Sequence, residues 1–440
     1  YYNITKITFH ANIVSIGEAA FYKAVNLKEA VFKAARMSVG MEISDEAFYD
    51  SGLETVVFEE NGTWNSGSYT ATTSCGVITI GESAFAKTNL KEINLPNSVR
   101  NVGKEAFAYN SALNKIDFAR VASDLAFGDY AFRSCSSLIN VELTANVGYM
   151  AFNSVFYGCN KLKGLKVAKD NPNYTQDAQG VVYNKDITEI AYYPDGYEGE
   201  YVMPETLTSL GGAVFKDKES LTAIVISKNI VSIGDSAFEG CINLSKVTFE
   251  AGGTDTLTIG ARAFYNCESL VSIELPARTV SIGEECFKYY QTNIRRLSYV
   301  TLNEGLKTIG DAAFFYTSNL VQINIPSTVE YIGADAFWYS GVSEVTFNVT
   351  PSGVEKTPLV MGDGVFYNCN GLYEIALPER LAYVPYQAFY QCKNLEKVVI
   401  PTTVTNNGSD GTRAIGKEAF KLCSNLSTVE FTKGGDLPLS

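Results

Sequence analysis

The stretch SIGDSAFEGCINLSKVTF, residues 232–249, contains the residue types that nucleophilic and acid–base chemistry uses. Asp235 lies beside Ser236, and Cys241 and Lys246 follow closely. A serine or cysteine nucleophile works when a neighbouring base or cation activates it, so this composition raises the possibility of a catalytic site.

The same pattern of letters recurs along the chain, as in TIGESAFAKTNLKEINLP from Thr79, SIGEECFKYY from Ser281 and YIGADAFWYSGVSEVTF from Tyr331. A catalytic residue is needed once, whereas a structural unit is needed many times. The repetition therefore favours a structural role for each copy.

Other signatures of catalysis or cofactor binding are weak. His10 is the single histidine, which excludes every multi-histidine metal site and leaves one conceivable Ser–His–Asp triad. GTRAIGKE, residues 411–418, has the glycines and lysine of a phosphate-binding loop, but Glu418 stands where Ser or Thr must hold Mg²⁺. NNGSDGTRAIGK, residues 406–417, resembles a calcium loop, but Lys417 occupies the position of its bidentate glutamate. We expect no cofactor and no metal.

Adjacent carboxylates, such as Glu284 with Glu285 and Asp45 with Glu46, provide the residue types of glycoside hydrolysis. No pair is singled out by its context, and we interpret them as charged residues of solvated surface turns. We predict that the protein is not an enzyme and has no catalytic residue.

Seven of the nine cysteines share one register, three residues after a Phe and three before a Leu. An unbridged thiol is small and apolar, and it is among the most buried side chains in proteins. We interpret these seven as packing thiols rather than disulfides: Cys135, Cys159, Cys241, Cys267, Cys369, Cys392 and Cys423.

Composition limits the partners. The chain has 440 residues and a net charge of −13, from 48 acidic and 35 basic residues. Nucleic acids and anionic lipid surfaces are disfavoured, because binding to them relies on Lys and Arg. No apolar run approaches the ~20 residues that span a bilayer, so we expect no membrane insertion by this segment.

A periodic phenylalanine sets the repeat. It usually follows Ala, has Gly four residues earlier in twelve of fifteen cases, and recurs at a period of about 23 residues. Leu and Ile at fixed places within such a period are typical of leucine-rich solenoids. The anchor phenylalanines are Phe21, Phe48, Phe85, Phe107, Phe132, Phe156, Phe215, Phe238, Phe264, Phe287, Phe314, Phe337, Phe366, Phe389 and Phe420.

Each unit contains L-x-x-I-x-L, whose alternating apolar residues predict a strand with one buried face. The segment V-x-x-I-G follows, and its Gly either adopts positive φ or allows close approach of two backbones. We expect a short helical turn around the anchor Phe. Acidic residues just after the Gly suit the positive end of such a helix.

The pattern I-G-x-x-A-F-x-x-C-x-x-L-x-x-I-x-L-P resembles the BspA-like leucine-rich repeat family of bacterial surface proteins over nearly the whole chain. The resemblance implies an extracellular or cell-surface location and a role in adhesion or protein recognition. We predict an α/β repeat solenoid: a right-handed superhelix of about fifteen repeats, with parallel strands on one face and helical turns on the other.

Five insertions lengthen the unit, and all follow the predicted strand: residues 59–77, 168–203, 250–258, 348–361 and 401–413. Such insertions often carry function, although neutral drift of surface loops is the preferred explanation for the four shorter ones. Within the longest, GVVYNKDITEIAYYP predicts a hairpin around NKD. We predict a single solenoid over residues 1–440 with an inserted hairpin segment at 168–203. Because the chain opens on Tyr1 inside a strand-like segment, we expect truncated termini and a signal segment outside this chain.

From Phe264 to Phe389, every anchor is followed within two residues by an aromatic side chain, although other units have Lys216, Glu239 or Lys421 at that place. Stacked repeats would align these rings, and aromatic residues dominate binding hot spots. Alternatively, the rings merely cover neighbouring repeats. The candidate ligand-binding residues are Tyr265, Tyr289, Phe315, Tyr316, Trp338, Tyr339, Tyr367 and Tyr390.

The sequence thus favours a non-enzymatic module that binds a protein or glycan of a host or of the extracellular matrix. Carbohydrate binding through the aromatic stripe, and a structural spacer that presents another domain, are the alternatives. Outward strand positions such as Lys246, Thr248, Ser272 and Glu274 are of mixed polar type and indicate no ligand.

Overall fold

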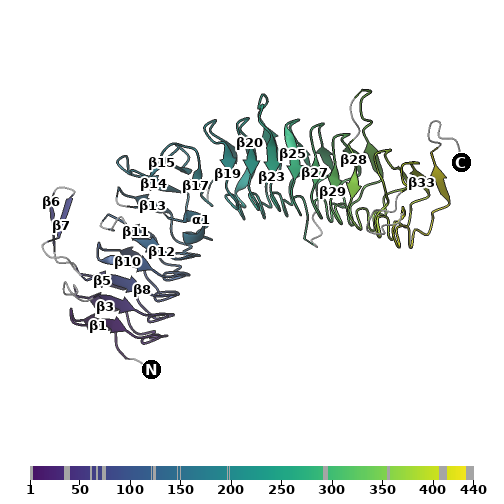
Figure 1. The fold of residues 1–440 in the computed structure, drawn as a ribbon. Coiled ribbons are helices and arrows are strands. Elements are labelled where there is room, and N and C mark those ends of the chain that lie inside the picture. The colour runs from purple at the N-terminus through teal and green to yellow at the C-terminus, as the bar shows by residue number, and fades with distance from the viewer. Residues whose placement is uncertain are drawn as a thin grey trace. The chain divides into compact units, whose positions relative to one another are not determined.

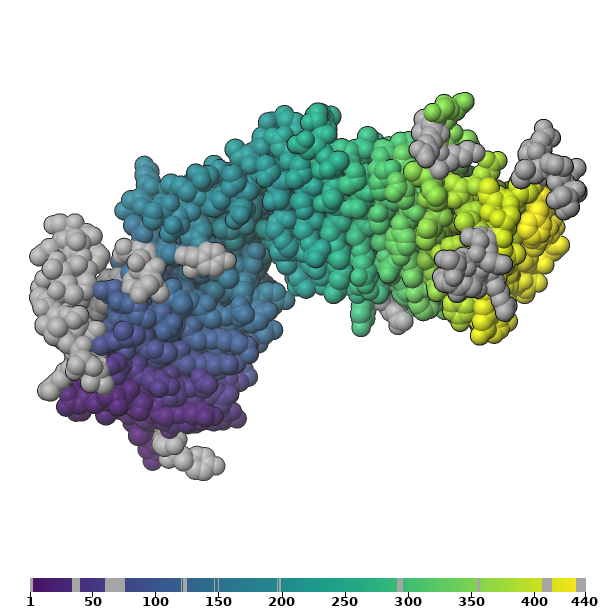
Figure 2. All heavy atoms as spheres, viewed as in Figure 1, coloured from purple at the N-terminus to yellow at the C-terminus, as the bar shows by residue number. Residues whose placement is uncertain are grey.

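The computed structural model is a β-solenoid whose strands stack in parallel rows (Figure 1). It divides into two compact units, Tyr1–Tyr197 and Glu198–Ser440. Within each unit successive coils form adjacent bands in the space-filling view (Figure 2). The described residues are 3–33, 40–59, 62–65, 68–71, 76–119, 121, 125–145, 147–148, 150–195, 197, 199–290, 296–353, 357–405 and 414–432.

The predicted L-x-x-I-x-L strands form the first strand row. Neighbours pair in parallel one coil apart, so that Ile7 lies opposite Ala30 and Ala30 opposite Val56. In the first unit the row comprises β1 (Lys6–Phe9), β3 (Glu29–Phe32), β5 (Thr55–Phe58), β9 (Glu92–Asn94), β11 (Lys115–Asp117), β13 (Asn140–Leu143) and β14 (Gly164–Val167). In the second it comprises β18 (Gly199–Val202), β20 (Leu221–Ile226), β22 (Lys246–Phe249), β24 (Ser272–Glu274), β26 (Tyr299–Thr301), β28 (Gln322–Ile325), β30 (Glu344–Phe347), β32 (Glu374–Ala376), β33 (Lys397–Ile400) and β34 (Thr428–Phe431).

A second strand row, which the sequence analysis did not predict, is formed by the V-x-x-I segments. Its strands have two to four residues, too few for an alternating pattern to be recognised. The first unit contributes β2 (Ser15–Ile16), β4 (Met41–Ile43), β8 (Ile78–Ile80), β10 (Val99–Val102) and β12 (Ala126–Phe127). The second contributes β19 (Ser209–Leu210), β21 (Ser232–Ile233), β23 (Leu257–Ile259), β25 (Thr279–Ile282), β27 (Thr308–Ile309), β29 (Tyr331–Ile332) and β31 (Val360–Met361).

The predicted helical turns are wrong. Among the described residues the single α-helix is α1 (Phe152–Val155), and the other segments around the anchor Phe, which we call the AF edge, are successive turns. In the first coil Ala19 and Lys23 have φ of 53° and 55°, which an α-helix of L-residues does not accommodate. The N–H groups of Ala19 and Phe21 donate to carbonyls of the next coil, at Asp45 and Ala47, rather than four residues back. The AF edge is therefore held by hydrogen bonds between coils.

The repeated Gly is required for close approach of two backbones. A Cβ placed on Gly283 would lie 2.4 Å from the carbonyl carbon of Gly260, and one on Gly310 would lie 2.5 Å from that of Gly283. The acidic residue after the Gly accepts a hydrogen bond from a backbone N–H and does not stabilise a helix dipole. The Oδ1 atom of Asp235, for example, accepts from the N–H of Ala261 at 2.8 Å. This corrects the dipole interpretation.

The anchor phenylalanines form the core as a stack of parallel rings. Phe238 is fully buried between Phe215 and Phe264, with 5.0 Å between ring centroids on each side. The seven cysteines predicted to be packing thiols are unbridged, which confirms that interpretation. Each donates its S–H to the carbonyl of the preceding anchor Phe, as Cys241 does to Phe215.

The longest insertion folds as a three-stranded antiparallel sheet of β15 (Tyr174–Gln176), β16 (Val182–Asn184) and β17 (Ile190–Tyr192), where β16 and β17 flank NKD. The insertion at 59–77 contains the hairpin of β6 (Gly62–Asn65) and β7 (Ser68–Ala71). The insertion at 59–77, like that at 250–258, lies between the first and second strand rows of a coil, whereas the last residues of 168–203 form β18 of the first strand row. The two loop motifs at 406–417 and 411–418 lie largely outside the described residues.

Candidate functional site

Six of the eight candidate residues meet on the AF edge of the second unit, and we call them the aromatic rail: Phe315, Tyr316, Trp338, Tyr339, Tyr367 and Tyr390. Four follow their anchors directly and contact one another in order along the coils. Phe315 lies edge-on to Trp338 at 4.9 Å, and Trp338 lies at 4.9 Å from Tyr367. Tyr367 stacks on Tyr390 at 4.8 Å.

Tyr316 and Tyr339, two residues after their anchors, form a parallel second row. Their rings stack at 5.0 Å with an interplanar angle of 11°. Tyr339 is 38% exposed. Both residues have positive φ, 61° for Tyr316 and 55° for Tyr339, as this position does in nearly every coil. The turn thus directs these rings outward from the AF edge.

Tyr289 does not belong to the rail. It is 2% exposed, and its hydroxyl donates to the carbonyl of Cys267 at 3.1 Å. It is not among the positive-φ residues, so the backbone takes a different course at this coil and the ring enters the core. Burial raises its pKa.

Tyr265 lies apart from the rail. Its neighbour is the guanidinium of Arg262, whose central carbon is 4.4 Å from the ring centroid. In the next coil Lys288 directly follows its anchor, as Tyr265 does, and the Lys288 Nζ lies 4.6 Å from the centroid of Phe315. At the other end, the Nζ of Lys421 lies 5.8 Å from the centroid of Tyr390. The rail therefore has a cation at each end and rings between them.

Two features of the rail are unfavourable for stability. The Nε1 atom of Trp338 is covered and has no hydrogen-bond partner in the described part of the chain. Beside it, burial raises the pKa of the Asp335 carboxyl, and repulsion from Asp311 and Asp363 adds to the effect. Burial also raises the pKa of Tyr367.

The AF edge of the first unit has a similar row that the sequence analysis missed. Tyr22 stacks on Tyr49 at 5.2 Å, and the guanidinium of Arg133 lies 5.5 Å from Tyr109 and 5.6 Å from Tyr157. The sequence feature that could have revealed this row is the position of these aromatic residues, one or two residues after the anchor Phe. Alanines follow two intervening anchors and interrupt the pattern.

The described residues contain no group of three or more His, Cys, Asp or Glu side chains that could hold a metal ion. His10 is exposed at the end of β1. No helix in the described part of the chain is long and apolar enough to cross a membrane.

Comparison with known proteins identifies the repeat. The chain matches the family described as BspA type leucine rich repeat region, in six copies, over residues 1–75, 65–178, 208–343 and 346–436. The chain belongs to this family. None of the curated proteins compared with this BspA-type chain matches it.

Solved structures similar to this BspA-type chain are of bacterial leucine-rich repeat proteins. One from Bacteroides ovatus is 19% identical with a TM-score of 0.48, over 98% of this chain and 93% of that one. The pneumococcal vaccine antigen PcpA is 17% identical with a TM-score of 0.45, over 98% and 90%. A leucine rich cell surface protein from Faecalibacterium prausnitzii is 16% identical with a TM-score of 0.41, over 99% and 89%.

Proposed function

We propose that this chain is a non-enzymatic recognition module, displayed at a bacterial cell surface, that binds a protein of a host or of the extracellular matrix through the aromatic rail. Membership of the BspA-type family supports the surface location. The observation that carries the binding proposal is the positive φ of Tyr316 and Tyr339.

Positive φ is unfavourable for a bulky side chain, by about 1–2 kcal/mol for L-residues relative to the right-handed region. Other coils of the same unit place Gly240, Asn266 and Asn368 at this position, and these residue types adopt positive φ at lower cost. The turn therefore does not require tyrosine. Asp217, Gln391 and Leu422 also hold this position at positive φ, so the strain belongs to the repeat, and the choice of tyrosine in two adjacent coils is what supports the proposal.

Trp338 supports the same argument. A covered N–H group without a partner costs about 1–3 kcal/mol. Phe315 and Tyr367 occupy the equivalent places in the neighbouring coils with no covered, unpartnered polar atom among the described residues. A tryptophan retained at such a cost is expected where its large ring contributes to contact with a partner.

The arrangement of the rings favours a protein over a glycan at the rail. Sugars stack on free ring faces, but the faces of Tyr316 and Tyr339 cover each other. Each ring therefore offers at most one free face together with its edge and hydroxyl group, which suits the mixed apolar and polar surface of a protein. A glycan at the rail, and a spacer whose rings only cover neighbouring coils, are the alternatives.

The test replaces Tyr316 and Tyr339 together with Asn, the residue that this chain uses at the same turn position at Asn266 and Asn368. Tyr109→Asn, at the same position in the first unit with φ of 61°, is the matched control. Capture of extracellular-matrix proteins and glycans on an array is measured together with the melting temperature.

We expect the double variant to keep or raise its melting temperature and to lose capture of a protein that the wild type and the control bind. Loss of glycan capture instead would support the carbohydrate alternative. Full retention of binding, or collapse of the fold, would overturn the proposal.

A further inference from the structure

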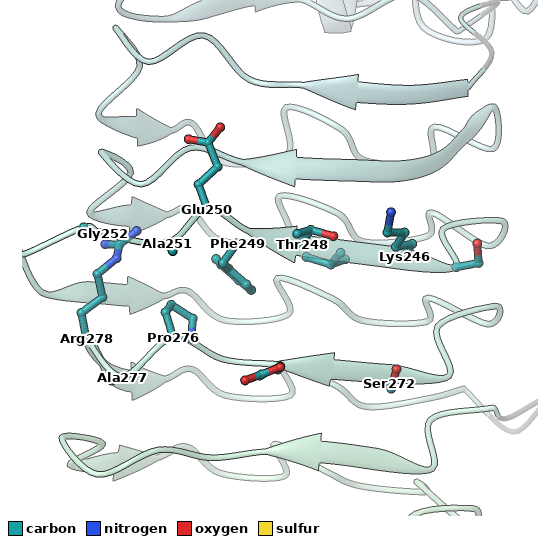
Figure 3. Close-up of a pocket in the computed structure, with 14 residues that line it drawn as sticks. Lys246, Thr248, Phe249, Glu250, Ala251, Gly252, Ser272, Pro276, Ala277 and Arg278 are labelled. Atoms are coloured by element: carbon teal, nitrogen blue, oxygen red, sulfur yellow. The ribbon is translucent and has the colours of Figure 1, made fainter.

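A pocket of about 590 Å³ opens on the exposed side of the first strand row where β22 and β24 lie together (Figure 3). Exposed residues of the two strands, Lys246 and Thr248 on β22 and Ser272 and Glu274 on β24, line it. The insertion that follows β22 forms its end wall, from Glu250 to Gly253. The volume is in the range of small-ligand sites.

The end wall is held in place by Arg278. Its Nη1 atom donates to the carbonyl of Asp255 in the insertion at 3.2 Å and to that of Ile230, two coils back, at 2.6 Å. Arg380 makes the equivalent contact two coils back, where it donates to the carbonyls of Val329 and Pro326. The pocket is thus built by a fixed loop.

The pocket has an apolar surface and a polar rim. Phe249 is half-buried, makes no ring contact with another aromatic side chain in the described part of the protein, and lies near Pro276 (Figure 3). Thr248, Ser272 and Glu274 have no side-chain hydrogen bond within the described ranges, so their donors and acceptors remain available to a ligand.

The charges around the pocket disfavour an anionic ligand. The ammonium group of Lys246 is engaged by Glu200 at 3.2 Å, whereas the carboxylate of Glu274 has no ion pair among the residues that the structure describes. Glu250 adds a second carboxylate at the wall, where it accepts from the N–H of Lys228. The guanidinium of Arg278 donates from Nη1 to the carbonyls of Asp255 and Ile230, while its Nε and Nη2 atoms have no partner among the described residues.

A pyranose sugar has the complementary chemistry. One face of its ring presents C–H groups that pack on an aromatic or proline surface, and its edge presents hydroxyls. A carboxylate accepts hydrogen bonds from hydroxyls strongly, and the side-chain hydroxyls on both strands supply donors and acceptors. We propose that this pocket binds a neutral pyranose unit of a glycan, with Phe249 as the stacking surface and Glu274 as the principal hydrogen-bond acceptor.

The strand row continues the site in one direction. Tyr299 on β26 is the register partner of Ser272 and is 68% exposed, with its side chain on the same face of the row. A glycan of two or more units that begins in the pocket reaches this ring next. The outward strand residues gave no such indication in the sequence because the pocket depends on the insertion beside them.

The test measures binding of neutral methyl pyranosides, with the N-acetylated sugars among them, to the full chain by calorimetry and by saturation-transfer NMR. Glu274→Gln and Ser272→Ala change exposed side chains and leave the core intact. Glu374→Gln on β32, an exposed carboxylate of the same row outside the pocket, is the matched control. Sialic acid and an acidic peptide are the anionic probes.

We expect at least one neutral sugar to bind with a Kd near or below about 1 mM, with saturation transfer to its C–H protons. Glu274→Gln should weaken this binding at least tenfold, and Glu374→Gln should leave it unchanged. No binding by any neutral sugar, equal binding in the Glu274 variant, or preference for an anionic probe would overturn the proposal. The rail variant with Asn at 316 and 339 should bind the sugar normally, so failure of one site does not imply failure of the other.

Discussion

Truncation of Phe238 to Ala tests the ring stack that forms the core. The Phe238 side chain is fully buried, with ring planes tilted by only 5° from Phe215 and 11° from Phe264. A Phe→Ala change in a core costs about 3–5 kcal/mol. Two ring pairs are lost at once, and each contributes about 0.5–1.5 kcal/mol beyond burial of its area. We therefore expect a loss in the upper part of that range, about 4–5 kcal/mol.

The loss should be measured locally, because a repeat protein unfolds in parts and a single global midpoint averages over them. The amides of Phe238 and Gly240 donate to the carbonyls of Ala263 and Tyr265 in the next coil. Their hydrogen exchange should accelerate about a thousandfold, since each 1.4 kcal/mol is a factor of ten. The urea midpoint should fall as well.

The matched control is Phe431→Ala, the same substitution at a side chain that is 59% exposed. It should change stability by less than about 0.5 kcal/mol. An unchanged urea midpoint and unchanged exchange in the Phe238 variant would refute the assignment of the ring stack as the source of stability.

Three further predictions follow from buried groups. Burial raises the pKa of the Cys241 thiol to about 12 and that of the half-buried Cys423 to about 11. A thiol reagent near pH 8 should therefore label Cys423 first and Cys241 only on unfolding. Equal labelling rates of the two thiols in the native protein would contradict this. Trp338→Phe removes the unpartnered N–H and should raise or preserve the melting temperature while weakening partner capture, whereas a clear loss of stability would show a structural role for the indole. Burial, with repulsion from Asp311, raises the pKa of Asp335 above its ordinary 3.8, so ionisation of Asp335 destabilises the fold as pH rises through that raised value. The melting temperature of Asp335→Asn, relative to wild type, should therefore increase between about pH 3 and pH 7. A difference in melting temperature that is constant with pH would disprove the pKa shift.

The sequence predicted the parts of the coil whose side chains repeat visibly. Leu and Ile alternate with polar residues in the first strand row, and Phe and Cys recur in register with the coils. The buried face of the strands and the position of the packing thiols could therefore be predicted. The AF edge was misread because its Ala, Glu and Lys are good helix formers. Gly158 and Gly240, both at positive φ, mark the position where the helix is impossible, but they occur in only two of the coils.

The candidate site was partly readable for the same reason. The offset of aromatic residues from the anchor Phe predicted the six members of the rail, whereas Tyr289 has the same offset in a coil whose backbone departs from the repeat. The pocket beside β22 could not be predicted from the strand residues. It depends on an arginine that bonds to carbonyls from two different parts of the chain, a contact that has no periodic signature.

The direction of the hydrogen bonds has a mechanical consequence. Along both strand rows and the AF edge they run from coil to coil, while the covalent chain circles around the stack. Tension applied along the stacking direction within a unit is therefore borne by non-covalent layers in series, and the weakest layer opens first. Each coil that opens releases about 23 residues, or roughly 75–85 Å of extended chain. A protein of this design would extend under load in steps of one coil, dissipating work at each step while the coils that remain closed keep their surfaces intact.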